Sequence, residues 1–339
     1  MAEDRIWYAS YAPGVPTRLD YEKTTLSAAL TRSAETFPNR SALNYMGRKI
    51  SYAELNGLVN AFARTLADLG VHPGDKAAVC LPNIPEAVIA NYAIFRIGAV
   101  TVQNNPLYTE RELAYQLNDS DAKILITLSL LLPRIKKIWG QIRSEKVIAC
   151  NLNNYLPVPL KQMFPWVRRC MYRRIRESAD VLSFSKLLPR YPDTAVEDQS
   201  RWENLGALLY TGGTTGKSKG LMLTHANLSS NVQQFAAWFP DLKKGEESLV
   251  GNFPIFHSAG FTAIQNYCIW QANEIILVPR PEPRNNIRIL KKYRPTFLPG
   301  EPPSLWACWQ IPTLLKSIFQ ASKVSFPGPP RWLRTPFDA

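Results

Sequence analysis

The chain has 339 residues, 46% hydrophobic and 20% charged, a composition typical of a globular protein with one large or two modest domains. Its longest apolar run, residues 124–132, is shorter than the roughly 20 residues needed to cross a bilayer, and the N-terminus lacks the basic-then-apolar order of a signal peptide. Five widely spaced cysteines match no disulfide or metal-ligand spacing, so we expect a reducing compartment. The net charge of +13 favours an anionic partner: a nucleotide, coenzyme A, a membrane surface or a nucleic acid.

Helices and strands are predicted to alternate after an irregular N-terminal arm, residues 1–24. Apolar residues recur at helical spacing in segments 26–36, 52–69, 83–97 and 110–117. Short apolar runs predict strands at 42–46, 49–51, 76–81, 99–102 and 123–127, the first two as a hairpin around Gly47. Because most of these strands are nearly continuous in apolar residues, we predict an α/β fold with a parallel sheet.

The segment 161–176 combines six basic residues with aromatic and aliphatic side chains. On one helix, Phe164, Val167, Met171 and Ile175 would share a face flanked by arginines. A basic amphipathic helix with aromatic residues can lie on an anionic membrane, so one interpretation is peripheral membrane contact. The alternative is a face that docks on the protein's own core. We expect no nucleic-acid binding, because no recognised nucleic-acid module surrounds the segment.

The segment 208–224 has the most informative composition. Strands are predicted at 208–210 and 221–223, and the nine residues 211–219 hold three glycines, three threonines and two lysines. Glycine lets the backbone approach a ligand closely, while threonine hydroxyls, amides and lysines bind phosphate oxygens. The loop therefore indicates a nucleotide triphosphate site; the alternative is an ordinary surface loop. The candidate phosphate-binding residues are Thr211, Gly212, Gly213, Thr214, Thr215, Gly216 and Lys219.

The P-loop pattern G-x-x-x-x-G-K-(S/T) is only partly matched here. Gly216, Lys217 and Ser218 fit its end, but Thr211 occupies the position of its first glycine. A P-loop also requires a helix at the lysine, whereas a strand is predicted at 221–223. A P-loop phosphotransferase is therefore a minor alternative.

Residues 210–220, Y-T-G-G-T-T-G-K-S-K-G, resemble the signature loop of the AMP-forming acyl-CoA synthetases, the adenylate-forming superfamily. The usual form is (Y/S)-(S/T)-G-(G/S)-T-(S/T)-G-x-x-K-G, and every fixed position is met. Residues 224–227 are similar to the T-H-x-N that follows in the family, with Thr224 as the N-cap of a helix over 226–239. Residues 106–109, 111–113 and 117–120 resemble the bacterial long-chain fatty acid-CoA ligases in particular, where they are scaffold.

This resemblance implies parallel-sheet-rich N-terminal subdomains of the adenylate-forming fold. It also implies a fatty acid and a nucleotide as partners, with ATP, Mg²⁺ and coenzyme A taking part in a reaction through an acyl-adenylate. The implied location is the cytoplasm, either free or peripheral at the inner membrane face. Amino and aryl acids are less favoured as substrates.

A second candidate site lies in residues 251–260, which resemble the P-x-(F/Y)-H segment of the family. The resemblance implies that Phe256 and His257 lie beside the acyl-adenylate and the acyl pocket. The following apolar segment 261–270 is expected to be a helix that forms one wall of that pocket. A strand over 274–278 and a short helix over 287–292 are predicted next.

We expect the resemblance to end near Gly300, which gives a partial AMP-binding domain over 25–300 and a disordered, non-family tail over 301–339. Some codon choices for 304–339, read one base earlier, give family-like F-I-V-G-L-L-A-N-P-D-I-A and L-S-G-A-A-P, so one hypothesis is a frameshift near 301–303, which the DNA of the gene would decide. In the family the adenine-binding motif, the hinge and the C-terminal domain with its catalytic lysine come later. We therefore expect a truncated, inactive ligase without that domain, and assign no catalytic residue and no metal ligand. The alternative is a non-catalytic fragment that binds ATP or a membrane.

Overall fold

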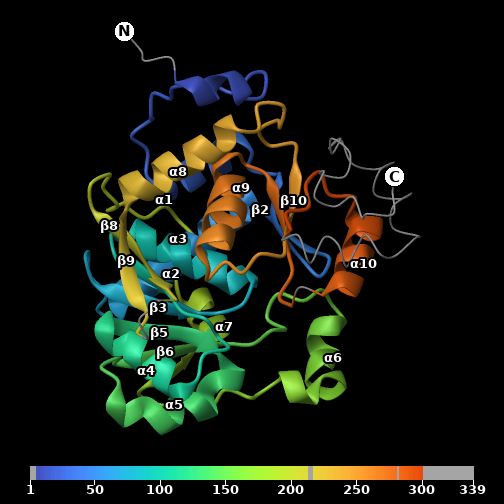
Figure 1. Cartoon of the computed structure of the whole chain (residues 1–339). Coiled ribbons are helices and arrows are strands. Elements are labelled where there is room, and N and C mark those ends of the chain that lie inside the picture. Colours follow the sequence, from blue (N-terminus) through green and yellow to red (C-terminus); the bar gives the residue numbers. More distant parts are fainter. Residues whose placement is uncertain (1–4, 213–216, 281, 301–339) are drawn as a thin grey trace, which may run out of the picture.

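The computed structural model describes residues 5–212, 217–280 and 282–300 (Figure 1). Its larger sheet has seven strands in the order β7-β6-β5-β3-β4-β8-β9. Neighbouring strands are parallel except β8 and β9, which form an antiparallel hairpin at one edge. The strands are β3 (Lys76–Cys80), β4 (Val100–Gln103), β5 (Ala122–Leu128), β6 (Lys146–Cys150), β7 (Val181–Ser183), β8 (Leu205–Thr211) and β9 (Lys219–Thr224). The predicted parallel α/β sheet is confirmed.

The smaller sheet has four strands in the order β10-β11-β1-β2. They are β1 (Ser41–Tyr45), β2 (Arg48–Ser51), β10 (Ser248–Gly251) and β11 (Glu274–Leu277). β11 pairs in parallel with both β10 and β1, while β1 and β2 form the predicted hairpin. Its turn requires positive φ at Met46 and Gly47, with values of 55° and 103°.

The described residues form ten α-helices, some of which cover the two faces of the larger sheet. They are α1 (Leu26–Thr36), α2 (Tyr52–Asp68), α3 (Pro85–Arg96), α4 (Glu110–Asp119), α5 (Leu132–Ile138), α6 (Leu160–Val167), α7 (Phe184–Leu187), α8 (His225–Ala237), α9 (Tyr267–Trp270) and α10 (Pro283–Tyr293). A π-helix, η6 (Gly260–Asn266), leads directly into α9, and short 3₁₀ turns complete the set: η1 (Ile6–Ser10), η2 (Ser129–Leu131), η3 (Trp139–Gln141), η4 (Arg169–Met171) and η5 (Leu188–Arg190).

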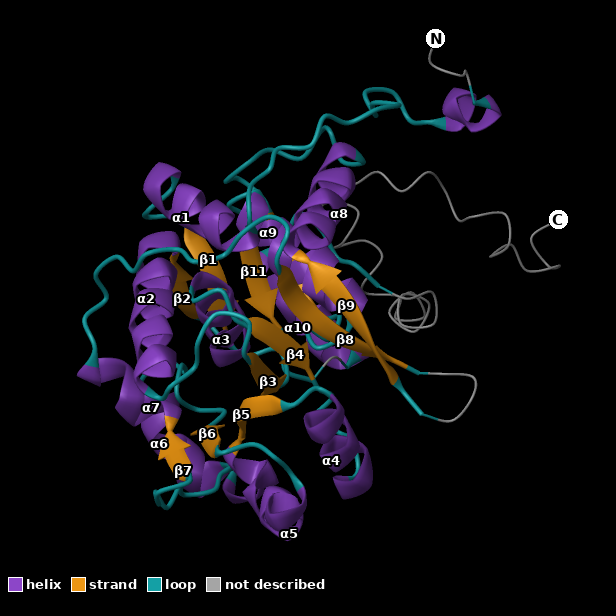
Figure 2. Ribbon diagram, turned by 90° about the vertical axis from the view of Figure 1, so that its left-hand side faces the viewer, coloured by secondary structure: helices purple, strands orange, loops and turns teal. Residues whose placement is uncertain are grey.

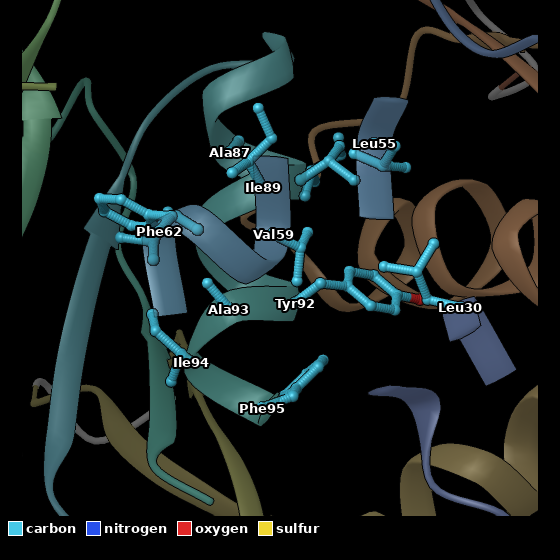
Figure 3. Packing of buried hydrophobic residues seen from close by; sticks show 14 of the residues in the cluster. Leu30, Leu55, Val59, Phe62, Ala87, Ile89, Tyr92, Ala93, Ile94 and Phe95 are labelled. Atoms are coloured by element: carbon cyan, nitrogen blue, oxygen red, sulfur yellow. The ribbon is translucent and has the colours of Figure 1, made fainter. Parts of the chain in front are cut away.

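The main core joins α1, α2 and α3 to one face of each sheet (Figure 3). Every residue of α3 is buried, which explains why its sequence is apolar almost all round. The opposite face of the larger sheet packs under α4 and α5. Alternate strand residues serve the two cores: Ala77 and Val79 face the main one, while Ala78 and Cys80 face the other.

The predicted helix boundaries need one correction that matters for the site. The helix expected over 83–97 begins only at Pro85. Ile84 is extended, with φ −128° and ψ 160°, because the residue before a proline avoids helical geometry. Asn83 therefore lies in a loop rather than in the helix.

The prediction of one basic helix over 161–176 is wrong. α6 ends at Val167, η4 follows, and the chain is extended at Tyr172, with φ −127° and ψ 136°. Pro165 lies inside α6, and a helix-interior proline lacks an N–H and clashes with the preceding turn. Phe164, Val167, Met171 and Ile175 therefore do not share one helical face. Within residues 5–212, 217–280 and 282–300, no helix has the length and apolarity that crossing a membrane requires.

Candidate functional site

Both candidate loops follow the carboxyl ends of strands. Ligands of α/β proteins commonly bind outside this end of the sheet. In the larger sheet β3, β4 and β8 are parallel neighbours, so the segments after them emerge at the same edge. These segments are the loop with Asn83, the loop that begins at Asn104, and the predicted phosphate loop.

The phosphate loop lies at the tip of the β8–β9 hairpin, which projects from the body of the molecule (Figure 2). Thr211 pairs with Lys219 at the end of the ladder. The structure places three predicted site residues here, since Thr211, Gly212 and Lys219 are all exposed. The other four, Gly213, Thr214, Thr215 and Gly216, lie outside the described residues. The strand β9 follows the loop where a P-loop would have a helix, which argues against the P-loop alternative.

Helix α4 supports the stem of this hairpin through three side chains that the sequence did not single out. The Tyr115 hydroxyl donates to the Ser218 carbonyl oxygen at 3.1 Å, and Gln116 Nε2 donates to Ser218 Oγ at 3.2 Å. The Tyr210 hydroxyl donates to Asp119 Oδ2 at 2.7 Å. Burial and the Asp119 carboxylate both raise the pKa of Tyr210, so this hydroxyl keeps its proton at neutral pH.

A cleft of about 560 Å³ is lined by residues of α4 and of the stem. Its lining includes Arg111 and Lys217 together with the carboxylate of Glu112. The Lys217 ammonium lies 5.8 Å from the centre of the Tyr115 ring, within cation–π range. Two cations beside one carboxylate, together with Lys219 at the end of the ladder, make this region suitable for a polyanionic ligand.

The second candidate site is the histidine loop, residues 251–260, which leaves the carboxyl end of β10 and enters η6. Phe256 is half-buried and His257 is exposed. The Ala259 N–H donates to His257 Nδ1 at 3.4 Å, an arrangement in which the proton of a neutral His257 ring lies on Nε2. A Cβ at Gly260 would lie 2.1 Å from the Pro254 carbonyl oxygen, so the loop closes on itself too tightly for any other residue.

His225, from the T-H-x-N segment, is buried and structural. Its ring packs edge-on against Phe95 and lies 3.1 Å from the position of a Cβ on Gly206. Neither ring nitrogen has a hydrogen-bond partner among the residues the structure describes. Burial lowers the pKa of His225 to about 4 and keeps the ring neutral. Its neighbour Thr224 forms the predicted N-cap of α8, with a capping box to Asn227.

A buried polar chain runs from the helix after the histidine loop toward the phosphate loop. Asn91 Nδ2 donates to Gln265 Oε1 at 2.9 Å, and Gln103 Nε2 donates to Asn91 Oδ1 at 2.6 Å. The next residue, Asn104, donates through Nδ2 to Gln116 Oε1 at 2.7 Å, and Gln116 reaches Ser218. Across the described ranges no hydrogen bond joins the two loops directly, and the two halves of this polar chain are connected by the peptide bond between Gln103 and Asn104.

The relatives of this chain are acyl-CoA ligases, and the match covers about half of the length of each relative. It is 34% identical over 305 residues to the long-chain-fatty-acid–CoA ligase of Bacillus subtilis (strain 168), covering 89% of this chain and 54% of the relative. It is 30% identical over 303 residues to the ligase of the same name from Escherichia coli O157:H7, covering 87% and 54%. The chain thus spans about half the length of the curated relatives it matches.

Solved structures agree on the fold. A long-chain-fatty-acid-CoA ligase (FadD1) from Archaeoglobus fulgidus matches with a TM-score of 0.73 and 27% identity, over 88% of this chain and 56% of that one. The anthranilate CoA ligase AuaEII, in complex with anthranoyl-AMP, matches with a TM-score of 0.75 and 20% identity, over 89% and 54%.

The model of the AMP-binding enzyme family matches residues 30–327, a range that continues past Gly300, where the sequence resemblance was expected to end. Residues 301–339 lie outside the described part of the chain, so the disordered tail and the frameshift stay predictions. Because the matched range contains most of the chain, together with the β8–β9 hairpin and the histidine loop, the protein belongs to the AMP-binding enzyme family.

Proposed function

We propose that this fold serves the AMP-forming ligation of a long-chain fatty acid to coenzyme A. In the first step a carboxylate oxygen attacks the α-phosphorus of ATP, bound with Mg²⁺ as substrate, and pyrophosphate leaves as the acyl-adenylate forms. In the second step the coenzyme A thiol attacks the acyl carbon, loses its proton and displaces AMP. The observation that carries the proposal is the Thr-Gly-Lys hairpin tip at the carboxyl end of a parallel strand, beside the Arg111–Lys217 cleft.

The described residues of the two loops and of the cleft would have different roles in this reaction. Lys217, Lys219 and Arg111 supply positive charge that offsets the phosphates and the departing pyrophosphate. His257, with its proton on Nε2, is suited to hold one oxygen of the fatty acid carboxylate while the other attacks. Phe256 supplies apolar surface beside that carboxylate. The names of the relatives favour a long-chain fatty acid over other acids.

The test measures MgATP binding to the 339-residue chain by titration calorimetry, followed by pyrophosphate release in the presence of palmitate. Lys219→Ala should weaken binding by about tenfold or more, because a charge-assisted contact to phosphate contributes roughly 1.5–3 kcal/mol. Lys217→Ala should have a smaller effect, since that position varies in the signature. Lys136→Ala on α5 is the matched control, an exposed lysine remote in sequence from both loops. Equal affinity in the wild type and the Lys219 variant would refute the assignment of the loop.

A second proposal is contact with an anionic membrane surface through the basic segment 161–176, together with the apolar Val158 shortly before it. Its apolar side chains are unusually exposed: Trp166 at 69%, Val167 at 65% and Val158 at 70%. All eight residues of α6 are at least partly exposed, although Phe164 packs against the main core, and the helix lies at the periphery in Figure 1. Basic residues supply the complementary charge, at about 1 kcal/mol each near an anionic surface. They are Lys161, Arg168, Arg169, Arg173, Arg174 and Arg176.

Flotation with vesicles tests this second proposal. We expect binding to vesicles containing phosphatidylglycerol and little to pure phosphatidylcholine. Trp166→Ala/Val167→Ala should reduce the floated fraction. Leu221→Ala/Met222→Ala on β9 should not, although these control side chains are also exposed, at 51% and 66%. Binding that persists in the first double variant would locate the membrane contact elsewhere.

A further inference from the structure

Asn83 lies between the two sheets of the protein. It follows β3 of the larger sheet, and its side chain reaches the histidine loop that follows β10 of the smaller sheet. Only 3% of Asn83 is exposed. A buried amide must satisfy two donors and one acceptor, and such groups are rarely left unpaired.

The partners of this amide all belong to the backbone of the histidine loop. Asn83 Nδ2 donates to the carbonyl oxygens of Gly251 at 2.8 Å and Phe253 at 2.7 Å. Asn83 Oδ1 accepts from the Ile255 N–H at 2.8 Å. The opposite amide orientation would set a donor against the Ile255 N–H and an acceptor against two carbonyls, so the partners fix the orientation. One side chain thus holds three backbone groups of the chain as it leaves β10.

The three hydrogen bonds hold the backbone immediately before the predicted site residues. Ile255 precedes Phe256 and His257 directly, and the His257 N–H closes the next turn onto the Pro254 carbonyl at 3.0 Å. The tight approach of Gly260 to the same carbonyl closes the loop from its other end. The positions of Phe256 and His257 are therefore set from one side by Asn83 and from the other by Gly260.

We propose that Asn83 is a positioning residue, which holds the histidine loop so that Phe256 and His257 meet the carboxylate of the substrate. The consequence for catalysis rests on the proposed function. The restraint on the loop does not depend on the proposed function, and it can be measured without any substrate.

Hydrogen–deuterium exchange of the 339-residue chain tests the restraint. In Asn83→Ala, the peptide over 252–261 should exchange at least about tenfold faster, because local opening no longer breaks three hydrogen bonds. The control is Asn273→Ala. Asn273 is 1% exposed, and its Oδ1 accepts from the N–H groups of Gly245 and Glu247 at 3.1 and 3.2 Å, in a different loop. Exchange over 252–261 that stays within twofold of the wild type in Asn83→Ala, or rises equally in the control, would overturn the proposal.

Asn83→Asp gives a second, pH-dependent readout. The variant keeps the acceptor for Ile255 but places a carboxylate oxygen against the Gly251 and Phe253 carbonyls. Protonation restores one donor, so the excess exchange over wild type, corrected for intrinsic rates, should shrink as pH falls from 8 to 5. An excess independent of pH would show that the amide donors do not hold the loop.

Histidine modification provides a readout at the site itself. The chain has three histidines, and the exposed His72 serves as the internal reference for the rate at which diethyl pyrocarbonate modifies His257. The ratio of the two rates should change in Asn83→Ala and stay constant in Asn273→Ala. If palmitate-dependent pyrophosphate release is detected, Asn83→Ala should also lower kcat or raise KM for the fatty acid, with KM for ATP within twofold of wild type. If the wild-type chain shows no release, which is the result expected of a truncated ligase, the exchange and modification results still decide the role of Asn83.

Discussion

Replacing Glu86 by glutamine should stabilise the protein above neutral pH. Glu86 is the second residue of α3, is 2% exposed, and accepts a hydrogen bond from Asn154 Nδ2 at 2.9 Å. Burial raises the pKa of this carboxyl from 4.5 to about 7, although Asn154 and Lys161 act in the opposite direction. The ionised form is therefore disfavoured in the folded protein.

The magnitude and the sign follow from proton linkage. One pKa unit corresponds to about 1.4 kcal/mol, so the rise from 4.5 to about 7 corresponds to roughly 3 kcal/mol of unfolding free energy. Between pH 4.5 and 7 the folded state binds more protons at Glu86 than the unfolded state does. Stability from this group is thus complete below pH 4.5 and is lost as pH rises through 7. Glutamine is neutral throughout and keeps an acceptor for Asn154.

Urea unfolding followed by circular dichroism at pH 4.5, 6, 7 and 8.5 measures the difference. Glu86→Gln should match the wild type at pH 4.5 and gain up to about 3 kcal/mol at pH 8.5. The control is Glu35→Gln on α1, where the carboxylate is exposed. A Glu86 variant less stable than the wild type at pH 8.5 would refute the reasoning, because it would mean that the ionised carboxylate holds the segment around Asn154 and Lys161.

Three further changes test the packing behind the candidate sites. His225→Gln should make the stability depend less on pH below 6.5. Because the pKa of His225 is lowered to about 4, the stability from this group in the wild type falls by up to about 3 kcal/mol as pH drops from 6.5 to 4. Urea unfolding at pH 4.5 and 7 measures this loss. Gly260→Ala should destabilise the protein by at least about 2 kcal/mol in thermal unfolding, because its Cβ would overlap the Pro254 carbonyl; an unchanged melting temperature would contradict the tight closure of the loop. Tyr210→Phe should cost about 1 kcal/mol through loss of the bond to Asp119 and speed exchange in β8 and β9; unaltered exchange there would show that the Tyr210–Asp119 bond does not support the hairpin.

The sequence predicted the elements whose patterns are local. Continuous apolar runs indicated the parallel strands β3, β4 and β5, and Gly47 marked the β1–β2 hairpin. It did not predict β6, although residues 147–150 form an apolar run, nor the three-residue strand β7. The single helix predicted over 161–176 was wrong. The prediction used the helical spacing of the apolar residues and took no account of Pro165, and the regular helix ends within one turn after this proline.

The same distinction, between features with a local sequence pattern and features without one, applies to the candidate sites. The candidate ligand-binding residues, such as Lys219 and His257, belong to contiguous motifs that a sequence displays directly. The residues that hold those motifs come from other elements: Gln116 lies on α4, about a hundred positions before Ser218, and Asn83 lies 168 positions before Gly251. Their side chains gain a role only when folding brings these distant elements together, because an asparagine or glutamine in a loop or helix looks the same in the sequence whether it faces solvent or hydrogen-bond partners. Tertiary contact, and not composition, is therefore what separates Asn83 from the other asparagines of this chain.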